Sequence, residues 1–215
     1  MKPILFSTPM VQAILDGRKT QTRRVIKFPL PDNYNVHRFD GINEDGLFAF
    51  AWGVIVPGLY LDGGCEVKAP YSVGDVLWVR ETWKPQDYFY VDDIMSCQII
   101  FKAGGPDNLN PRVSWNHGED TIFESCGTWH PSIHMPREAA RLFLRVTRVR
   151  VERVQDIFKE PTGPNSPIVK EGFSYGCDFI ATWDSLNAKR GYGWDSNPWV
   201  WVITFERITK EDAVE

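Results

Sequence analysis

The N-terminal region shows the helical spacing of apolar residues most clearly. Its apolar stripe consists of Met10, Val11, Ile14 and Leu15. Because these positions recur at intervals of three and four, they predict one buried face of a helix over residues 9–16. Thr8 is a capping residue type, Pro9 suits the first helical turn, and Gly17 suits the left-handed position after the last turn. The pattern therefore places the residues from Arg18 onward directly after a helix end.

Apolar runs bounded by turn residues predict several strands in the rest of the chain. We expect them at residues 46–52, 76–83, 96–102 and 199–208. The last run is apolar on both faces, which is typical of a strand in the middle of a sheet. The segments between these runs are rich in Gly, Pro, Asn and Asp and read as loops, above all residues 104–128 and 161–167.

A strand expected over residues 142–154 changes the phase of its alternation. Its apolar positions are Leu142, Leu144, Val146, Val149 and Val151. They fall on even numbers up to 146 and on odd numbers from 149. Such a change of phase predicts a β-bulge near Thr147 and Arg148, as in a strand that bends around a small barrel.

A second helix is expected over residues 178–190, with Gly191 as its stop. Its apolar face consists of Phe179, Trp183 and Leu186. Many strands, two helices and no regular alternation of the two argue for a mixed, barrel-like fold. The sequence thus predicts an α+β protein in which one domain, residues 1–215, forms a small β-barrel with flanking helices and long loop insertions.

The composition is that of an ordinary globular protein. Of the 215 residues, 43% are hydrophobic and 24% are charged, which excludes wholesale disorder. No run of about 18 apolar residues occurs, so no membrane-spanning helix is expected. The apolar run at the N-terminus is too short for a secretory signal, and the four cysteines lie far apart in the sequence. We therefore expect reduced thiols and a cytoplasmic protein with no membrane partner.

The net charge of −4 conceals two basic segments. Residues 1–27 hold six cations against Asp16 alone, and residues 137–153 hold six arginines against two glutamates. Basic segments on an acidic body indicate either a local anionic partner or pairing with the acidic excess of the rest of the chain. Charge alone favours the second interpretation.

The strongest candidate for chemistry is the run Gly17-Arg18-Lys19-Thr20-Gln21-Thr22-Arg23-Arg24. An ammonium crowded by guanidinium groups is disfavoured in its charged form, which lowers its pKa toward that of a general base. A neutral Lys19 is able to take the proton of the Thr22 hydroxyl where a twist or turn brings the two together. The alternative is an exposed basic turn that pairs with carboxylates, and the run by itself favours that alternative.

The pattern G-R-K-T-x-T-x-R after a capped helix resembles the signature of the ASCH domain, a compact β-barrel relative of the PUA RNA-binding fold. Three later runs are similar to the larger ASCH proteins of phages and prophages: GDVLWVRETW at 74–83, WHPSIHMPR at 129–137 and NPWVWV at 197–202. The resemblance covers most of the chain. It implies a PUA-like ASCH domain with insertions at about 28–73 and 103–128.

The ASCH family includes small bacterial amidohydrolases that remove the acetyl group of N4-acetylcytidine with a lysine, a threonine and a glutamate. The motif match implies Lys19 and Thr22 as the first two residues. It implies Glu171 as the third, because Glu171-Gly172-Phe173 follows the mid-chain strand as that glutamate does in the small enzymes. Lys19 would deprotonate Thr22, and Glu171 would return the proton to the leaving amine. Glu171 is equally well explained as a surface carboxylate that neutralises Arg24.

Four further residues are expected to bind substrate: Thr20, Arg23, Arg24 and Trp83. Either Arg24 or backbone amides would stabilise an oxyanion. Trp83 lies at a strand end and is the best candidate for stacking on a base, whereas most of the other tryptophans should belong to the core of so small a barrel.

Metal ligands are present in the sequence without the spacing of a metal site. The candidates are Cys126, His130 and His134, with His117 nearby. Pro131 prevents a regular helix from aligning the two later histidines, so we expect neither a metal nor a cofactor.

The sequence therefore supports three functional readings. The first is an ASCH protein that recognises a nucleoside or a base of single-stranded RNA, and that hydrolyses an N4-acetylcytidine-type amide as a weaker extension. The second is a non-catalytic RNA or modified-base binding module, in which the same Lys and Arg residues hold phosphate. The third is a metal-assisted ribonuclease, for which no carboxylate cluster with suitable spacing occurs.

Overall fold

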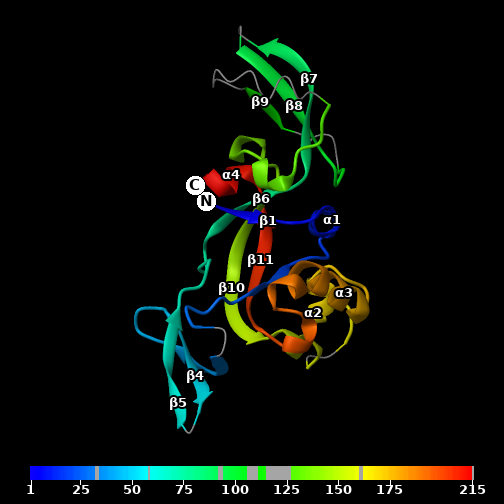
Figure 1. The fold of residues 1–215 in the computed structure, drawn as a ribbon. Helices are drawn as coiled ribbons and strands as arrows, with labels where there is room; N and C mark the ends of the chain where they lie inside the picture. The colour runs from blue at the N-terminus through cyan, green and yellow to red at the C-terminus, as the bar shows by residue number, and fades with distance from the viewer. Residues whose placement is uncertain are drawn as a thin grey trace.

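The protein forms an elongated molecule with a large sheet in the middle and a small sheet at each end (Figure 1). The structure is a computed structural model, and it describes residues 1–31, 34–57, 59–91, 94–105, 111–114, 127–159 and 162–214. It is a sheet-rich α+β fold with few helices, as the sequence predicts. No described helix is long and apolar enough to cross a membrane.

The central sheet has five strands in the order β1-β6-β10-β11-β2. Their bounds are β1 Lys2–Leu5, β2 Gln21–Val25, β6 Val76–Arg80, β10 Phe143–Arg153 and β11 Trp199–Ile208. β1 runs parallel to β6, and the other neighbours are antiparallel. β11 lies inside the sheet as its two apolar faces predict, and the register of β10 shifts between Val146 and Arg148, where the change of phase predicts a bulge.

Each end sheet contains one of the strands that the sequence predicts. One is formed by β3 Asn35–Ile42, β4 Phe48–Val56 and β5 Leu59–Val67. The other is formed by β7 Trp83–Val91, β8 Ile94–Phe101 and β9 Arg112–Ser114. β4 overlaps the expected strand at 46–52, and β8 overlaps the one at 96–102. The first expected insertion, residues 28–73, thus holds a three-stranded sheet of its own, while most of the second, residues 103–128, lies outside the described residues.

The helices pack beside the central sheet. They are α1 Thr8–Leu15, α2 Pro167–Lys170, α3 Gly176–Asn187 and α4 Lys210–Val214, with short 3-10 turns η3 Ser132–His134, η4 Arg137–Ala139, η5 Val154–Phe158, η6 Ala188–Arg190 and η7 Trp194–Ser196. Ser7, and not Thr8, precedes the first helical residue. Gly17 and Gly191 adopt positive φ after α1 and η6, as expected of residues that end a helix.

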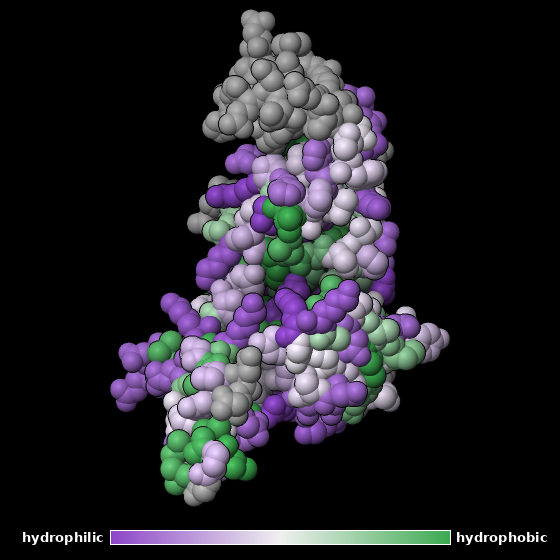
Figure 2. All heavy atoms as spheres, viewed as in Figure 1, coloured by the Kyte–Doolittle hydropathy of each residue, from purple (hydrophilic) through white to green (hydrophobic). Residues whose placement is uncertain are grey.

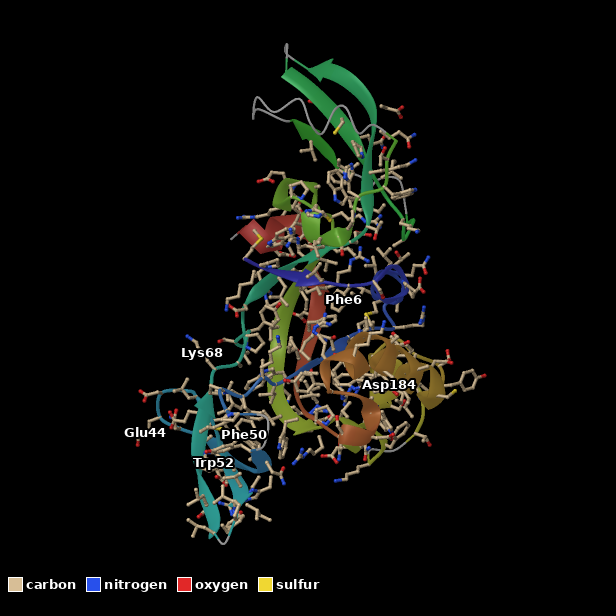
Figure 3. The ribbon with its side chains drawn as sticks, viewed as in Figure 1. Phe6, Glu44, Phe50, Trp52, Lys68 and Asp184 are labelled. Atoms are coloured by element: carbon tan, nitrogen blue, oxygen red, sulfur yellow. The ribbon has the colours of Figure 1, made fainter. Side chains whose placement is uncertain are left out.

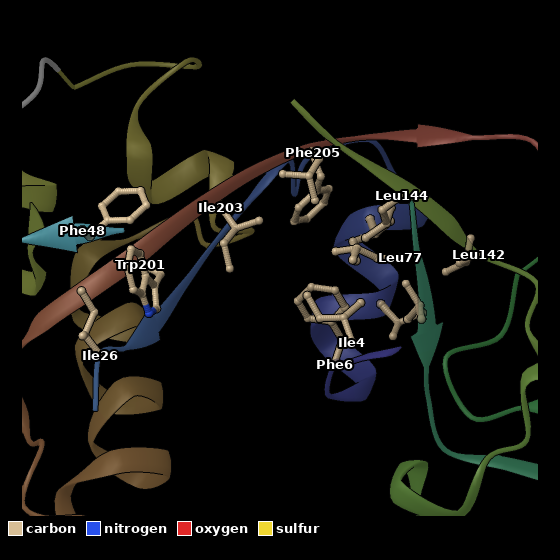
Figure 4. Close-up of a cluster of buried hydrophobic side chains, with 14 of the residues drawn as sticks. Ile4, Phe6, Ile26, Phe48, Leu77, Leu142, Leu144, Trp201, Ile203 and Phe205 are labelled. Carbon is tan, nitrogen blue, oxygen red and sulfur yellow. The ribbon is translucent and has the colours of Figure 1, made fainter. Parts of the chain in front are cut away.

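The largest core cluster lies on one face of the central sheet (Figure 4). Trp201, Ile203 and Phe205 alternate along β11 and point to this face because side chains two residues apart in a strand share a side. Phe48 of β4 packs edge-on against Trp201, with ring centroids 4.6 Å apart. This contact fastens the β3-β4-β5 sheet to the central sheet, and Figure 3 shows Phe50 and Trp52 on the same hairpin.

The strand expected at 76–83 is divided in two. β6 ends at Arg80, and Trp83 begins β7 in a different sheet. Between them Glu81 is buried and accepts two hydrogen bonds from Arg141, each 2.9 Å long. A buried carboxylate needs such a partner, so this ion pair fixes the point where the chain leaves the central sheet.

The central sheet is not closed into a barrel within the described residues. Its edge strands, β1 and β2, approach each other without forming a strand pair. The Arg24 guanidinium of β2 instead donates a 2.7 Å hydrogen bond to the backbone oxygen of Leu5. The sheet is therefore open at one seam, and a side chain bridges that seam.

Removing a core side chain should cost far more stability than removing the same side chain from an end sheet. Leu77 is fully buried on β6, whereas Leu59 on β5 is 56% exposed. We expect Leu77→Ala to lower the free energy of unfolding by about 2–5 kcal/mol. Leu59→Ala should change it by less than about 1 kcal/mol. Urea denaturation followed by circular dichroism measures both, and equal losses would contradict this assignment of the core.

Candidate functional site

A cleft of about 800 Å³ opens along the seam between β1 and β2. One wall is formed by β1 and the start of α1, the floor by β2, and the opposite wall by α3 and η6. Figure 3 shows Phe6 on the first wall and Asp184 on α3 below it. On the face seen in Figure 2, hydrophilic side chains gather between these two levels, beside an apolar strip.

The end of α1 brings Lys19 behind this floor. The amides of Arg18 and Lys19 both donate to the carbonyl of Ala13, which turns the chain sharply after Gly17. Gly172 packs against the turn with φ +92, and a Cβ placed there would lie 2.9 Å from the Cβ of Ala13. Only glycine tolerates that approach, so Gly172 allows the turn that carries Glu171 to reach Lys19.

Lys19 is completely buried and donates three hydrogen bonds. Its Nζ lies 2.8 Å from the backbone oxygen of Gln21, 2.9 Å from the backbone oxygen of Glu171 and 3.0 Å from Glu171 Oε2. These three acceptors occupy every proton that an ammonium group can donate. The basic run alone does not foresee this burial, whereas the ASCH resemblance already groups Lys19 with Glu171.

Glu171 joins Lys19 to Arg23. Its Oε1 accepts a 2.9 Å hydrogen bond from Arg23 Nη1, while its Oε2 faces Lys19. The other side of the Arg23 guanidinium is held by Glu152 of β10, with Nε 2.8 Å from Oε1. Glu171 is only 3% exposed. It is therefore neither on the surface nor paired with Arg24, contrary to the alternative that the sequence left open.

Burial is the main influence on the pKa of Lys19 and lowers it from 10.5. Glu171 opposes this change through its charge and its hydrogen bond, whereas the charges of Arg24 and Arg23 add smaller decreases. The sequence argument thus has the direction of the shift right and its leading cause wrong. Desolvation lowers the pKa because a buried site disfavours the charged form.

Thr22 and Arg24 line the cleft, and Glu171 and Arg23 reach it from below. Thr22 pairs with Ile203 of β11 and makes no hydrogen bond through its hydroxyl to another described residue. Arg24 lies 5.5 Å from the centre of the Phe6 ring in addition to its bond to Leu5. The structure therefore brings together Lys19, Thr22, Arg23, Arg24 and Glu171.

Two other expected site residues lie elsewhere. Thr20 does not line the cleft, and its backbone bonds to Lys170 and Phe205. Trp83 is 2% exposed and belongs to the core cluster beneath the β7-β8-β9 sheet, where its ring stacks on that of His130 at 4.8 Å. Neither Thr20 nor Trp83 therefore lines this cleft.

No group of three or more metal-ligating side chains occurs among the described residues. His130 packs on Trp83, and His134 lies in η3. The two other candidate ligands, Cys126 and His117, lie outside the described residues.

Several cleft residues escape the sequence argument because they come from distant segments. They are Tyr71, Phe173, Asn187, Arg190 and Tyr192. No spacing in the sequence links these positions to the basic run at 17–24. Burial raises the pKa of Tyr71, whose hydroxyl donates to the backbone oxygen of Pro3.

No protein-family model, curated protein or solved structure matches this chain. The chemistry of the site therefore follows from its own geometry. A hydroxyl on the cleft floor, a buried lysine and a buried carboxylate are the groups from which a nucleophile and a proton carrier are built. The cleft volume lies within the range of about 300–1,000 Å³ that is usual for small-molecule sites.

The lowered pKa of Lys19 should make stability rise with pH in the alkaline range. Between the folded-state pKa and 10.5, the unfolded chain binds a proton that the folded chain releases, so raising the pH favours folding. We expect the unfolding free energy of the wild type, minus that of Lys19→Met, to increase as pH approaches 10.5. Urea denaturation of both proteins from pH 7 to 10.5 measures this difference. A constant or falling difference would show that Lys19 keeps its proton in the folded state.

Proposed function

We propose that this protein is a single-domain ASCH protein that binds a cytosine nucleoside in the cleft and hydrolyses an amide on its exocyclic N4. The observation that carries the proposal is the buried contact of Lys19 with Glu171, directly behind the strand that presents Thr22 to the cleft. Residues 152 positions apart in the sequence meet there. Together with Thr22, Lys19 and Glu171 are the threonine, lysine and glutamate that the ASCH resemblance implies as catalytic.

The reaction needs one nucleophile and one proton carrier. Neutral Lys19 takes the proton of Thr22, and the Thr22 oxygen forms a bond to the acyl carbon. Lys19 hands this proton to Glu171 through their hydrogen bond, the bond between the acyl carbon and N4 breaks, and Glu171 gives the proton to the leaving amine. Water hydrolyses the resulting Thr22 ester, which releases the carboxylic acid and restores the hydroxyl. Either backbone amides or Arg24, which lines the same cleft, would stabilise the oxyanion, and backbone amides take this role where Arg24 holds another anion.

The architecture supports a PUA-like assignment. A central strand with a bulge, β10, bends the five-stranded sheet until its edges face each other across the seam. A nearly closed sheet of this kind is what a small barrel opened at a ligand site requires. The neutral and aromatic lining residues, among them Phe6, Phe173 and Tyr192, suit a nucleobase and sugar.

The second candidate is a module that binds a nucleoside or single-stranded RNA without catalysis. The three acceptors around Lys19 Nζ favour it, because they stabilise an ammonium group that has no proton to accept. In that case the Lys19-Glu171-Arg23 cluster supports the cleft floor and takes no part in a reaction. The two candidates share a binding site and differ only in turnover.

Substitution of Thr22 separates the two candidates. Thr22→Val keeps the shape of the side chain and removes the nucleophile, so it should reduce acetate release from N4-acetylcytidine by a factor of about 10³ or more. Thr22→Ser keeps a hydroxyl and should retain measurable turnover. Binding of N4-acetylcytidine should survive Thr22→Val, because the loss of one hydrogen bond costs about 1 kcal/mol.

Lys19→Met is the companion variant, since it fills the buried site without a titratable group. For the amidohydrolase, Lys19→Met and Thr22→Val should each abolish turnover, and the double variant should be little worse than either, because the two residues act as one unit. Chromatographic detection of cytidine and acetate gives the rates. A folded wild type that binds N4-acetylcytidine without turnover would contradict the amidohydrolase and support the binding module. A folded wild type that neither binds nor hydrolyses it would overturn both candidates.

A further inference from the structure

Three cations line the cleft without a carboxylate partner. Arg24, Lys27 and Arg190 are all lining residues, and none of them forms an ion pair with another described residue. Several other cations in the described part of the chain do form ion pairs: Lys2 with Asp75, Arg18 with Asp16, Arg38 with Asp40, Arg141 with Glu81 and Lys159 with Asp156. In a chain of net charge −4, an unneutralised cluster in a cleft is a local excess of positive charge.

The one carboxylate among the described lining residues, Glu171, forms no ion pair with any of these three cations. Glu171 already binds Lys19 through Oε2 and Arg23 through Oε1. Burial lowers the pKa of Arg24, the charge of Glu171 raises it, and the charge of Arg190 adds a smaller decrease, so the two guanidinium groups lie close enough to interact. Two like charges held near each other cost free energy, and an anion between them removes that cost.

Two of the three side chains are held in place by neutral acceptors. Arg24 donates to the backbone oxygen of Leu5, and Arg190 donates to Asn187 Oδ1 at 2.5 Å. Asn187 is buried and is itself fixed by a 3.0 Å hydrogen bond to the backbone oxygen of Trp183. Neutral acceptors orient a guanidinium group without cancelling its charge, so its positive charge remains free for a ligand.

The cations also come from both sides of the cleft. Arg24 lies on β2, Lys27 follows β2 by two residues, and Arg190 closes η6 at the end of α3. An anion bound by all three would therefore connect the floor to the α3 wall. A neutral nucleoside has no anionic group that these three cations could bind.

We propose that Arg24, Lys27 and Arg190 form a phosphate subsite, and that the ligand of the cleft is a nucleotide rather than a free nucleoside. Guanidinium groups match the geometry of phosphate oxygens through paired hydrogen bonds, and lysine adds a mobile point charge. The identification of the ligand as a cytosine nucleotide rests on the proposed function, whereas the phosphate subsite rests on the cations alone. The phosphate belongs either to a mononucleotide or to single-stranded RNA, and the experiment distinguishes these sources.

Calorimetric titration of the wild-type protein with matched ligands tests the subsite. The ligands are cytidine, cytidine 5′-monophosphate, cytidine 3′-monophosphate, pyrophosphate and a single-stranded oligocytidylate. We expect at least one monophosphate to bind roughly tenfold or more tightly than cytidine at low salt. That advantage should shrink as salt is added, since salt screens the charges. An oligocytidylate that binds more tightly than either monophosphate would identify RNA as the source of the phosphate.

Variants that remove one positive charge test whether the phosphate binds in the cleft. Lys27→Gln and Arg190→Gln should each reduce the preference for the monophosphate over cytidine severalfold. The double variant should bind the monophosphate and cytidine with nearly equal affinity. Lys189→Gln is the matched control, because Lys189 is exposed beside Arg190 and does not line the cleft. It should leave the preference unchanged. Thermal melting checks that each variant is folded.

The outcomes separate this inference from the proposed function. Equal binding of cytidine and both monophosphates, or an equal effect of all three single variants, would overturn the phosphate subsite and leave the nucleoside function intact. Pyrophosphate binding that requires Lys27 and Arg190, without any binding of cytidine compounds, would support the subsite and overturn the cytosine assignment. No binding of any ligand would overturn both.

Discussion

The buried contact of Lys19 with Glu171 is the interaction on which the rest of the site depends. Two charges removed from water are tolerated only because each finds the other and because backbone oxygens satisfy the remaining protons. Arg23 extends the contact to Glu152 of β10. The cluster therefore ties four separate parts of the chain together: the turn after α1, strand β2, the turn after α2 and strand β10. Removal of Glu171 would leave the buried Lys19 without a charged partner.

The curvature of the central sheet places an open seam and its cleft beside this cluster. The bulge in β10 bends the sheet, and the edges β1 and β2 come to face each other without pairing. Edge strands normally invite pairing with another strand. Here Arg24 bridges the seam instead, and the gap becomes a cleft with Thr22 on its floor. The β-bulge, which is readable in the alternation of valines and leucines along β10, thus accompanies the open seam at which this cleft lies.

Local sequence patterns predict the elements well and their connections poorly. The helix after Ser7, the bulge near Arg148, the stop at Gly191 and the central position of β11 all follow from spacing and turn chemistry, which are short-range effects. The break after Arg80 does not, because the ion pair that causes it involves Arg141, sixty positions away. The parallel pairing of β1 with β6 is likewise a long-range contact that no local pattern specifies.

The sequence by itself determined the chemical groups of the candidate site: the basic run after the first helix and, through its resemblance to the ASCH signature, the choice of Lys19, Thr22 and Glu171. Tertiary structure decided which of these groups are buried and what chiefly lowers the pKa of Lys19. Burial, and not the neighbouring guanidinium groups, is the chief reason that the pKa of Lys19 is lowered, and burial likewise removed Trp83 from the site. Only the fold brought Lys27 and Arg190 to the same cleft. The physical reason is that desolvation and unneutralised charge depend on which distant segments pack around a group, and spacing along the chain carries no information about that.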